Sequence, residues 1–179
     1  MGINYLSKIS NRVKSIYWNN FRSNESYARH LGVKIGEHCM IATRHWPTEA
    51  YLITIGNNVQ VTQDVYFHTH GGAHVAREKY PNFDVFGKIY IGDNVYIGSA
   101  SHIMPGVRIG NSSLIAAGSI VCKSVPAGEV WGGIPAKFIC TVEEYITKNE
   151  QYNLNSKNLS DKDKKGLLLS LPENKFLRK

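Results

Sequence analysis

The sequence predicts an all-β fold, a parallel β-helix of hexapeptide repeats with a helical segment at each end. The first observation is a six-residue period: from Ile91 the chain divides without a gap into IGDNVY, IGSASH, IMPGVR, IGNSSL, IAAGSI and VCKSVP. The second is that the first slot of each hexad holds Ile or Val, and the fifth holds Val or Ser. An α-helix repeats every 3.6 residues and a strand every 2, so neither explains one large and one small slot in every six.

Stacked coils of three hexads explain this pattern, because they bury a narrow core along one axis. The large aliphatic side chains then point inward, spaced by roughly 4.8 Å from coil to coil, and the small fifth-slot side chains fit the corners. We expect the second-slot glycines to permit the sharp bends between the short strands; they are Gly92, Gly98 and Gly110. The same frame begins upstream at Ile35 and Ile55, so the β-helix is expected over residues 32–140.

Two stretches interrupt the period. Residues 43–54 (TRHWPTEAYLIT) place His45 where a small inward residue is due, so the first coil is expected to be irregular. Residues 73–88 (AHVAREKYPNFDVFGK) lack the pattern altogether and are predicted to form an excursion loop, the kind of insertion that solenoids use for binding.

The two ends are predicted to be helical. In the N-terminal segment, residues 1–31, apolar side chains recur every three or four positions and leave the basic ones elsewhere, as in an amphipathic helix over 3–21. In the C-terminal cap and tail, residues 141–179, Thr141 and Glu144 form a capping box that opens a helix through about Glu150, which would cover the last coil. Ser160 and Asp163 form a second such box.

Composition limits the function classes. The chain has 179 residues, and no run of eighteen apolar residues could span a bilayer. Its three cysteines are far apart with no CxxC, which predicts reduced thiols in a cytoplasmic protein. The net charge is +7, but no Lys/Arg cluster is interleaved with aromatic residues, so we do not expect nucleic acid as a partner. Residues 1–31 carry five basic residues and one acidic residue, which favours a peripheral contact with the inner face of the membrane.

Four stretches resemble the hexapeptide-repeat acyltransferases, a family with left-handed β-helix folds, and within it the branch of saccharide O-acetyltransferases that modify galactosides, maltose, lipopolysaccharide and capsule. They are EAYLITIGNNV (49–59), FHTHGG (67–72), GKIYIGDNVYIGSASHIMPGVRIG (87–110) and AAGSIVCKSVPAGEVWGGIPAKFI (116–139). The repeats alone are weak evidence for acetyl transfer. The combination of Thr-His before an excursion with the later GSIVxKxxP and GxPAK is much more specific.

This resemblance implies a homotrimer that binds acetyl-CoA between neighbouring β-helices and uses a histidine, matching His70, as general base. The positions that match CoA contacts are Ser99, Ala117, Cys122, Lys123 and Lys137. Two departures stand out. Cys122 replaces a common threonine, and Gly71 follows the histidine where many relatives carry aspartate, so no adjacent carboxylate orients the ring.

The residues themselves support a base at position 70. Attack by an alcohol on a thioester needs a base with a pKa near 7, and the ordinary pKa of histidine is about 6.5. His70 occupies an outward slot of its hexad, and the glycines that follow let a substrate approach the backbone. A surface turn residue is the alternative interpretation.

Small residues also suggest a path for the cofactor. Ser99, Ala117 and Pro135 are eighteen apart, so a regular coil would align them in a column with room for the pantetheine arm. Lys123 and Lys137 would then meet the phosphates of CoA, although each alone is as readily a plain surface residue.

The residues that bind the acceptor are less well marked. The candidates are Trp46, Glu49, Tyr51, His68 and the Tyr80–Phe86 part of the excursion, since aromatic rings and a carboxylate suit sugars. Each aromatic residue could equally fill the irregular coil or shield a subunit contact. Glu49 could instead be the partner that orients His70.

The sequence therefore predicts an acetyl-CoA-dependent O-acetyltransferase acting on a saccharide or glycan precursor. The alternatives are an N-acetyltransferase acting on an amino nucleotide-sugar, and a non-enzymatic solenoid that docks on a membrane or partner through its N-terminal helix. A zinc lyase of the gamma-class carbonic anhydrase type is disfavoured, because that class uses two histidines five positions apart and no two of the seven histidines here have that spacing. We expect no metal.

Overall fold

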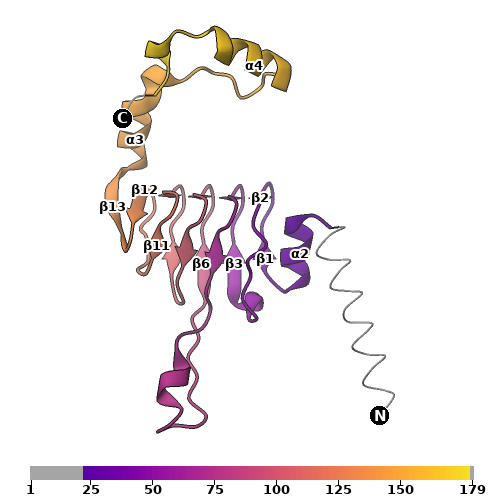
Figure 1. The fold of residues 1–179 in the computed structure, drawn as a ribbon, viewed down its shortest axis with the longest axis vertical. Coiled ribbons are helices and arrows are strands. Elements are labelled where there is room, and N and C mark those ends of the chain that lie inside the picture. The colour runs from indigo at the N-terminus through magenta and orange to yellow at the C-terminus, as the bar shows by residue number, and fades with distance from the viewer. Residues whose placement is uncertain (1–21, 178–179) are drawn as a thin grey trace.

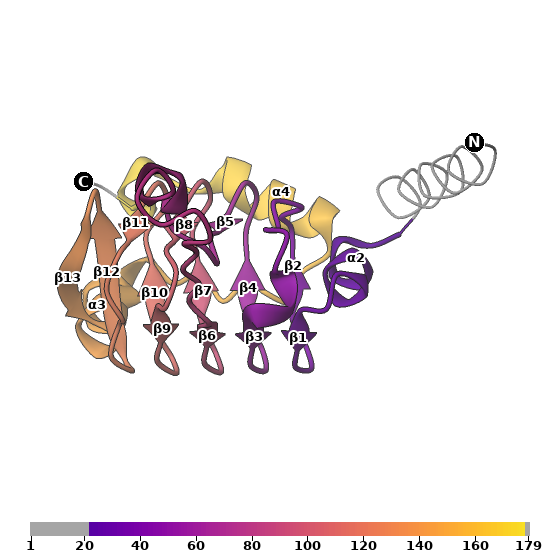
Figure 2. The same ribbon diagram turned by 90° about the horizontal axis from the view of Figure 1, so that it is seen from below.

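The computed structural model describes residues 22–177, and its strands form the three faces of a long prism (Figure 1, Figure 2). The first face contains β1 (Lys34–Ile35), β3 (Ile53–Ile55), β6 (Ile89–Ile91) and β9 (Arg108–Ile109). The second face contains β2 (Met40–Ile41), β4 (Gln60–Val61), β7 (Tyr96–Ile97), β10 (Leu114–Ile115), β12 (Glu129–Gly133) and β13 (Ala136–Thr141). The third face contains β5 (Tyr66–Phe67), β8 (His102–Ile103) and β11 (Ile120–Val121).

Strand pairing confirms the predicted coil of three hexads. Ile91 pairs with Ile109 and Ile97 with Ile115, in parallel and eighteen residues apart. Every pair of neighbouring strands is parallel except β12 and β13, which form an antiparallel hairpin at the end of the prism. In the last coil the spacing shortens to sixteen, since Ile115 pairs with Trp131.

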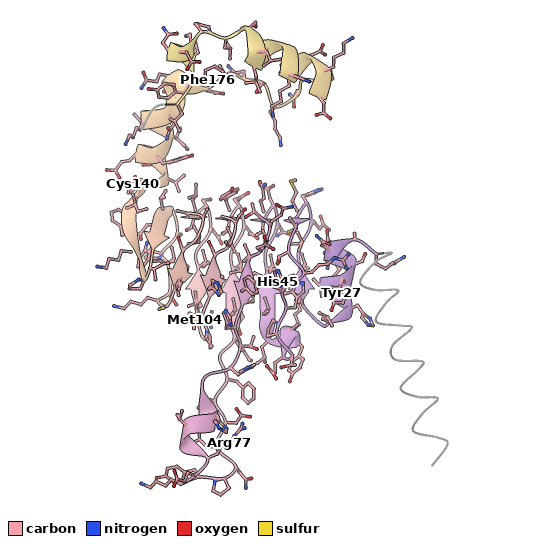
Figure 3. All side chains as sticks on the ribbon, in the orientation of Figure 1. Tyr27, His45, Arg77, Met104, Cys140 and Phe176 are labelled. Atoms are coloured by element: carbon pink, nitrogen blue, oxygen red, sulfur yellow. The ribbon has the colours of Figure 1, made fainter. Side chains whose placement is uncertain are left out.

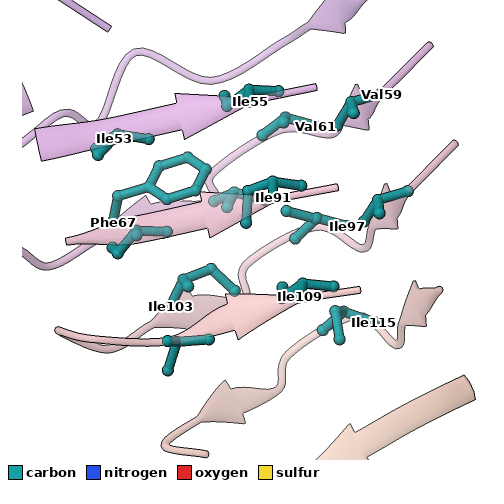
Figure 4. Close-up of a cluster of buried hydrophobic side chains, with 14 of the residues drawn as sticks. Ile53, Ile55, Val59, Val61, Phe67, Ile91, Ile97, Ile103, Ile109 and Ile115 are labelled. Atoms are coloured by element: carbon teal, nitrogen blue, oxygen red, sulfur yellow. The ribbon is translucent and has the colours of Figure 1, made fainter. Parts of the chain in front are cut away.

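The core is the predicted stack of first-slot side chains along the prism axis (Figure 4). The first-slot residues Ile97, Ile103 and Ile115 are fully buried, and so are Ile53 and Ile89, which lie two positions before the first-slot residues Ile55 and Ile91. Three fifth-slot serines are buried as well, and their hydroxyls donate to backbone carbonyls of the corners, as a buried hydroxyl requires; they are Ser101, Ser113 and Ser119.

The role expected for the second-slot glycines is wrong. The positive φ angles at the bends belong to the fourth slot, as at Asn94 (φ 57°) and Ala100 (φ 58°). The second-slot glycines instead lie against the next coil: a Cβ on Gly92 would be 2.8 Å from the backbone nitrogen of Asn111, closer than real Cβ atoms approach. Glycine is needed there because the coils stack closely, which a pattern within one hexad does not reveal.

Both predicted interruptions are present. Residues 42–52 form an irregular connection that includes the 3₁₀ helix η1 (Ala50–Leu52). The excursion leaves the prism where the Gly71 N–H donates to Val85 O at 3.1 Å and returns where the Gly87 N–H donates to Thr69 O at 2.8 Å. It contains η2 (Ala73–Ala76) and projects away from the prism (Figure 1).

At the N-terminal end, α2 (Asn24–His30) packs against the first coil through the buried Ala28. The amphipathic helix predicted over residues 3–21 lies outside the described residues. The contact with the membrane that it suggests therefore remains a prediction.

At the C-terminal end, α3 (Val142–Asn149) begins with the predicted capping box of Thr141 and Glu144. Hairpin β12–β13, which was not predicted, closes the end of the prism, and α3 follows from it. The elements η3 (Glu150–Tyr152), α4 (Asp161–Ser170) and η4 (Glu173–Lys175) complete the chain, and Ser160 caps α4 by accepting from the Asp163 N–H. No described residue after Ala136 is buried.

Candidate active site

His70 lies at the base of the excursion, just past the end of β5. The two hydrogen bonds that close the excursion flank it, and its backbone forms an antiparallel bridge with Phe86. Thr69, the residue before it, is fully buried. The backbone at position 70 is therefore held on both sides, while the imidazole itself is half exposed.

Glu49 is the partner of the His70 ring. His70 Nδ1 lies 2.9 Å from Glu49 Oε2, and the Glu49 side chain is only 19% exposed. An ionised carboxylate can only accept, so Nδ1 carries the proton and donates to Oε2. In this tautomer the lone pair of Nε2 is available, as a general base requires.

Three hydrogen bonds stabilise the charge of Glu49. The Thr48 hydroxyl donates to Oε1 at 2.7 Å, and the Thr69 hydroxyl and His70 Nδ1 donate to Oε2. The bond from Thr48 and then the bond from His70, with a smaller one from Thr69, lower the pKa of Glu49 to about 2, although desolvation opposes them. Glu49 is thus an anion at neutral pH, and its lone pairs are directed at the ring.

A pocket of about 310 Å³ opens beside this pair, between the prism and the excursion. His70 and Glu49 form one wall, and residues of the excursion form the other. The lining from the excursion is Gly71, Gly72, Ala73, His74, Arg77, Asp84 and Phe86.

His68 does not line this pocket but belongs to a column of rings on the third face. Its Nε2 lies 3.0 Å from His102 Nδ1, and the two ring planes are nearly parallel, 7° apart. His102 stacks on Tyr66 with ring centroids 4.8 Å apart, and Tyr66 stacks on His45 at 4.1 Å. Burial, and to a smaller extent the neighbouring His102 and His70, lower the pKa of His68. The ring is therefore held neutral, which agrees better with a structural role than with contact to the acceptor.

Two of the three small residues predicted to form a column are aligned in the structure. Ser99 and Ala117 lie in adjacent coils, the Gly118 N–H donating to Ser99 O at 2.8 Å, and both side chains are exposed. Pro135 is not in line with them, because the last coil is two residues shorter. The register Ile115 to Trp131 puts Gly133 in the column instead, and Pro135 lies in the turn between β12 and β13.

The other predicted cofactor residues lie at two different places. Cys122 and Lys123 follow β11, both exposed, on the edge of the third face where His70 follows β5. Lys137 is exposed on β13, opposite Gly132 and next to the end of the column.

Within one chain, His70 and the column are separated by the third face. Ser99 and Ala117 precede β8 and β11, whereas His70 and Lys123 follow β5 and β11. The strands between them run from one edge of the face to the other. One chain therefore displays His70 on one edge and the small-residue column on the opposite edge.

Comparison with known proteins places the chain in a family. A family model described as bacterial transferase hexapeptide (six repeats) matches residues 88–123. Over 157 residues the chain is 44% identical to Protein CapG of Staphylococcus aureus, an alignment that covers 85% of this chain and 91% of that protein. This protein belongs to the bacterial hexapeptide-repeat transferases. It is also 40% identical over 95 residues to galactoside O-acetyltransferase of Escherichia coli K12, covering 52% of this chain and 46% of that one.

Solved structures of this transferase family have the same fold, the predicted left-handed β-helix. A hexapeptide-repeat acetyltransferase of Vibrio cholerae in complex with acetyl coenzyme A aligns with a TM-score of 0.61 and 25% identity, over 78% of this chain and 88% of that one. A galactoside acetyltransferase in complex with coenzyme A aligns with a TM-score of 0.57 and 25% identity, over 78% and 82%. A maltose O-acetyltransferase of Clostridium difficile, at 24% identity and a TM-score of 0.62 over 77% and 84%, agrees in fold.

Of the residues predicted to bind the acceptor, only Glu49 and the Asp84 to Phe86 end of the excursion reach the pocket. Trp46 stacks on Phe67 with ring centroids 5.0 Å apart and packs against the core, so it fills the irregular coil. Tyr51 is 61% exposed and does not line the pocket.

Arg77 and His74 are polar pocket residues that sequence reasoning missed. Arg77 lies on the excursion, outside the prism (Figure 3), and no repeat or motif marks its position. Its approach to Asp84, with Nη2 3.8 Å from Oδ2, spans seven residues of an irregular loop.

Two further findings concern metals and membranes. Among residues 22–177, no group of three or more His, Cys, Asp or Glu side chains is placed to hold a metal ion. Within the same range, no helix has the length and apolar character needed to cross a membrane.

Proposed function

We propose that this protein is an acetyl-CoA-dependent O-acetyltransferase that acetylates a hydroxyl group of a saccharide, with His70 as the general base. The observation that carries the proposal is the His70–Glu49 pair, whose geometry leaves Nε2 free at the mouth of a pocket. Family membership supports the reaction class, because the most similar relatives and structures include acetyltransferases named for galactoside and maltose and a complex with acetyl coenzyme A.

The mechanism is a direct attack. Nε2 of His70 takes the proton of the acceptor hydroxyl as its oxygen bonds to the thioester carbonyl carbon. The tetrahedral intermediate collapses by breaking the C–S bond, and the thiolate of CoA leaves with the proton from the imidazolium. Glu49, which is ionised and bonded to Nδ1, stabilises the imidazolium formed between these two steps.

The residues of the chain fit a thin pantetheine arm and its phosphates. Ser99, Ala117 and Gly133 form an exposed column without large side chains, and Lys137 lies exposed beside its end. The exposed Lys123 lies on the His70 edge, opposite the column of its own chain. We therefore assign it to the site that this edge would form with the column of a neighbouring subunit.

A homotrimer follows as part of the proposal. In a closed ring each subunit uses two different surfaces, so that one edge of a face meets the opposite edge of the next subunit's face. Such a ring would bring His70 of one subunit to the Ser99–Ala117 column of its neighbour. The separation of these groups within one chain supports this arrangement.

The test of the base is His70→Ala, assayed as free CoA thiol released from acetyl-CoA across a panel of sugars, amino sugars and nucleotide-sugars. We expect transfer to fall by about 10²- to 10⁴-fold, with acetyl-CoA binding by calorimetry within twofold of wild type. His38→Asn is the matched control, because His38 is also an exposed histidine but lies far from the pocket lining. Unchanged turnover of His70→Ala would refute the assignment.

The same panel separates O-acetylation from the N-acetylation alternative. Transfer confined to amino sugars would identify the amine as nucleophile. The membrane contact predicted from the N-terminal helix over residues 3–21 has its own test, flotation with anionic liposomes of the full chain and of a chain lacking residues 1–20. Equal flotation of both would exclude that helix as the anchor.

A further inference from the structure

The excursion contributes a charged and aromatic wall to the pocket of His70, and the proposed reaction leaves this wall without a role. Its polar and aromatic members are His74, Arg77, Asp84 and Phe86, and together with the His70–Glu49 pair they line a space of about 310 Å³. A wall of this kind determines which acceptor can place a hydroxyl at Nε2.

Asp84 has hydrogen-bonding capacity to spare. Its Oδ1 accepts from the Val85 N–H at 3.2 Å, and the side chain is 45% exposed. Arg77 Nη2 lies 3.8 Å from Oδ2, which is too long for a hydrogen bond but close enough to hold the carboxylate electrostatically. Arg77 is itself anchored, because its Nε donates to Phe83 O at 3.2 Å. Each carboxylate oxygen can accept about two bonds, so Oδ2 can still accept from hydroxyl groups in the pocket.

The fixed charges of the pocket disfavour an acidic acceptor. The pocket is lined by two carboxylates, Glu49 and Asp84, by one guanidinium, that of Arg77, and by the imidazoles of His70 and His74. Three of the roughly four lone pairs of Glu49 are taken by Thr48, Thr69 and His70, so it repels anions and has less capacity than Asp84 to bind an acceptor. A carboxylate on the acceptor would meet this repulsion at close range.

Phe86 supplies the apolar part of the recognition. Its ring is 53% exposed and stands nearly perpendicular to the His70 imidazole, with centroids 6.4 Å apart. A pyranose presents hydroxyl groups at its edge and C–H groups on its faces, which match a carboxylate and an aromatic ring respectively.

We propose that the acceptor is an uncharged sugar ring, and that Asp84 binds hydroxyl groups next to the one that His70 deprotonates. The inference rests on the proposed function and narrows it to a substrate class. Asp84 binds the acceptor and takes no part in proton transfer, so it determines which sugars are accepted.

The experiment compares matched sugars that differ only at C6: glucose with glucuronate, and galactose with galacturonate. At saturating acetyl-CoA we expect kcat/KM for the better neutral sugar to exceed that of its uronate at least tenfold. In Asp84→Asn, which keeps the shape of the side chain, we expect KM for the neutral sugar to rise about tenfold with kcat within threefold. The neutral-to-uronate ratio should also shrink, because one repelling charge is gone.

Glu78→Gln is the matched control, since it removes one negative charge from the same exposed excursion without lining the pocket. We expect its kinetic constants and sugar preference to equal those of wild type. Equal use of a uronate and its neutral partner by the wild type, or equal KM values for wild type and Asp84→Asn, would overturn the inference while the acetyltransferase activity stands. No transfer to any sugar, with no binding of acetyl-CoA, would overturn the proposed function and this inference with it.

Discussion

Mixing two inactive variants tests whether each active site is built from two subunits. One variant is His70→Ala, which removes the proposed base but keeps the column of small residues. The other is Ala117→Trp, which fills the column with an indole but keeps the base. The side chain of Ala117 is exposed, so the larger residue has room outside the prism and should leave the fold intact.

The expected activity of the mixture follows from the positions of His70 and Ala117 on opposite edges of the third face. Each variant alone should keep at most about 1% of wild-type turnover, since a missing base costs about 10²-fold or more. In a ring assembled at random from equal amounts, a site works when the subunit that supplies His70 is intact there and its neighbour is intact at Ala117. Each condition holds for one half of the subunits, so about a quarter of the sites should be active.

The assay is acetyl transfer by the whole reassembled mixture, in which two different affinity tags serve only to confirm that mixed oligomers have formed. Wild type mixed equally with the double variant provides a second measurement, with about a quarter of the sites active if they are shared, against about a half if each subunit has its own. Mixed oligomers no more active than the single variants would refute the reasoning, because sites contained within one subunit cannot complement.

Three further predictions test the local physics. Glu49→Gln should lower kcat by about 10²-fold at unchanged KM, because Nδ1 of His70 loses the anion that fixes its tautomer. Since the pKa of Glu49 is about 2, this loss should persist from pH 9 down to pH 4; a loss that vanishes below pH 5 would contradict it. The pKa of His68 is lowered in the fold, so the unfolded chain binds protons more readily. The free energy of unfolding should therefore decrease as the pH falls below about 6.5. In urea titrations at pH 8 and 5.5, His68→Gln should show a smaller decrease in this free energy than wild type. Ile97→Ala should lower the free energy of unfolding by about 2–5 kcal/mol, because Ile97 is fully buried, and an unchanged urea midpoint would argue against the axial core.

The β-helix could be predicted in detail because its order is local. Each coil contacts only the coils next to it, so the requirement for a large inward residue and a small corner residue recurs in every hexad and accumulates over the chain. That repetition predicted that the side chains of Ile91, Ile97 and Ile103 would all point into the core. The excursion was located by the absence of the same signal.

The errors lie where the repeat carries no information. The second-slot glycines were assigned to bends because one hexad shows only its own backbone, whereas the contact at Gly92 comes from Asn111 in the next coil. Pro135 was placed in the column by counting eighteen, but the last coil is two residues shorter, because Ile109 bridges Val125 and Ile115 pairs with Trp131. Both errors concern contacts between coils, which the spacing does not encode.

The amino-acid sequence by itself determined the solenoid, its three faces, the capped helix at Thr141 and the position of His70 at the mouth of the excursion. Only the tertiary structure decided what surrounds that imidazole. Glu49 and Asp84 come from an irregular coil and a loop without periodicity, 21 residues before and 14 residues after His70, and meet in one pocket because the chain closes a coil and folds the excursion back on itself. Periodic burial can be predicted from spacing, but the approach of two aperiodic segments depends on the packing of everything between them.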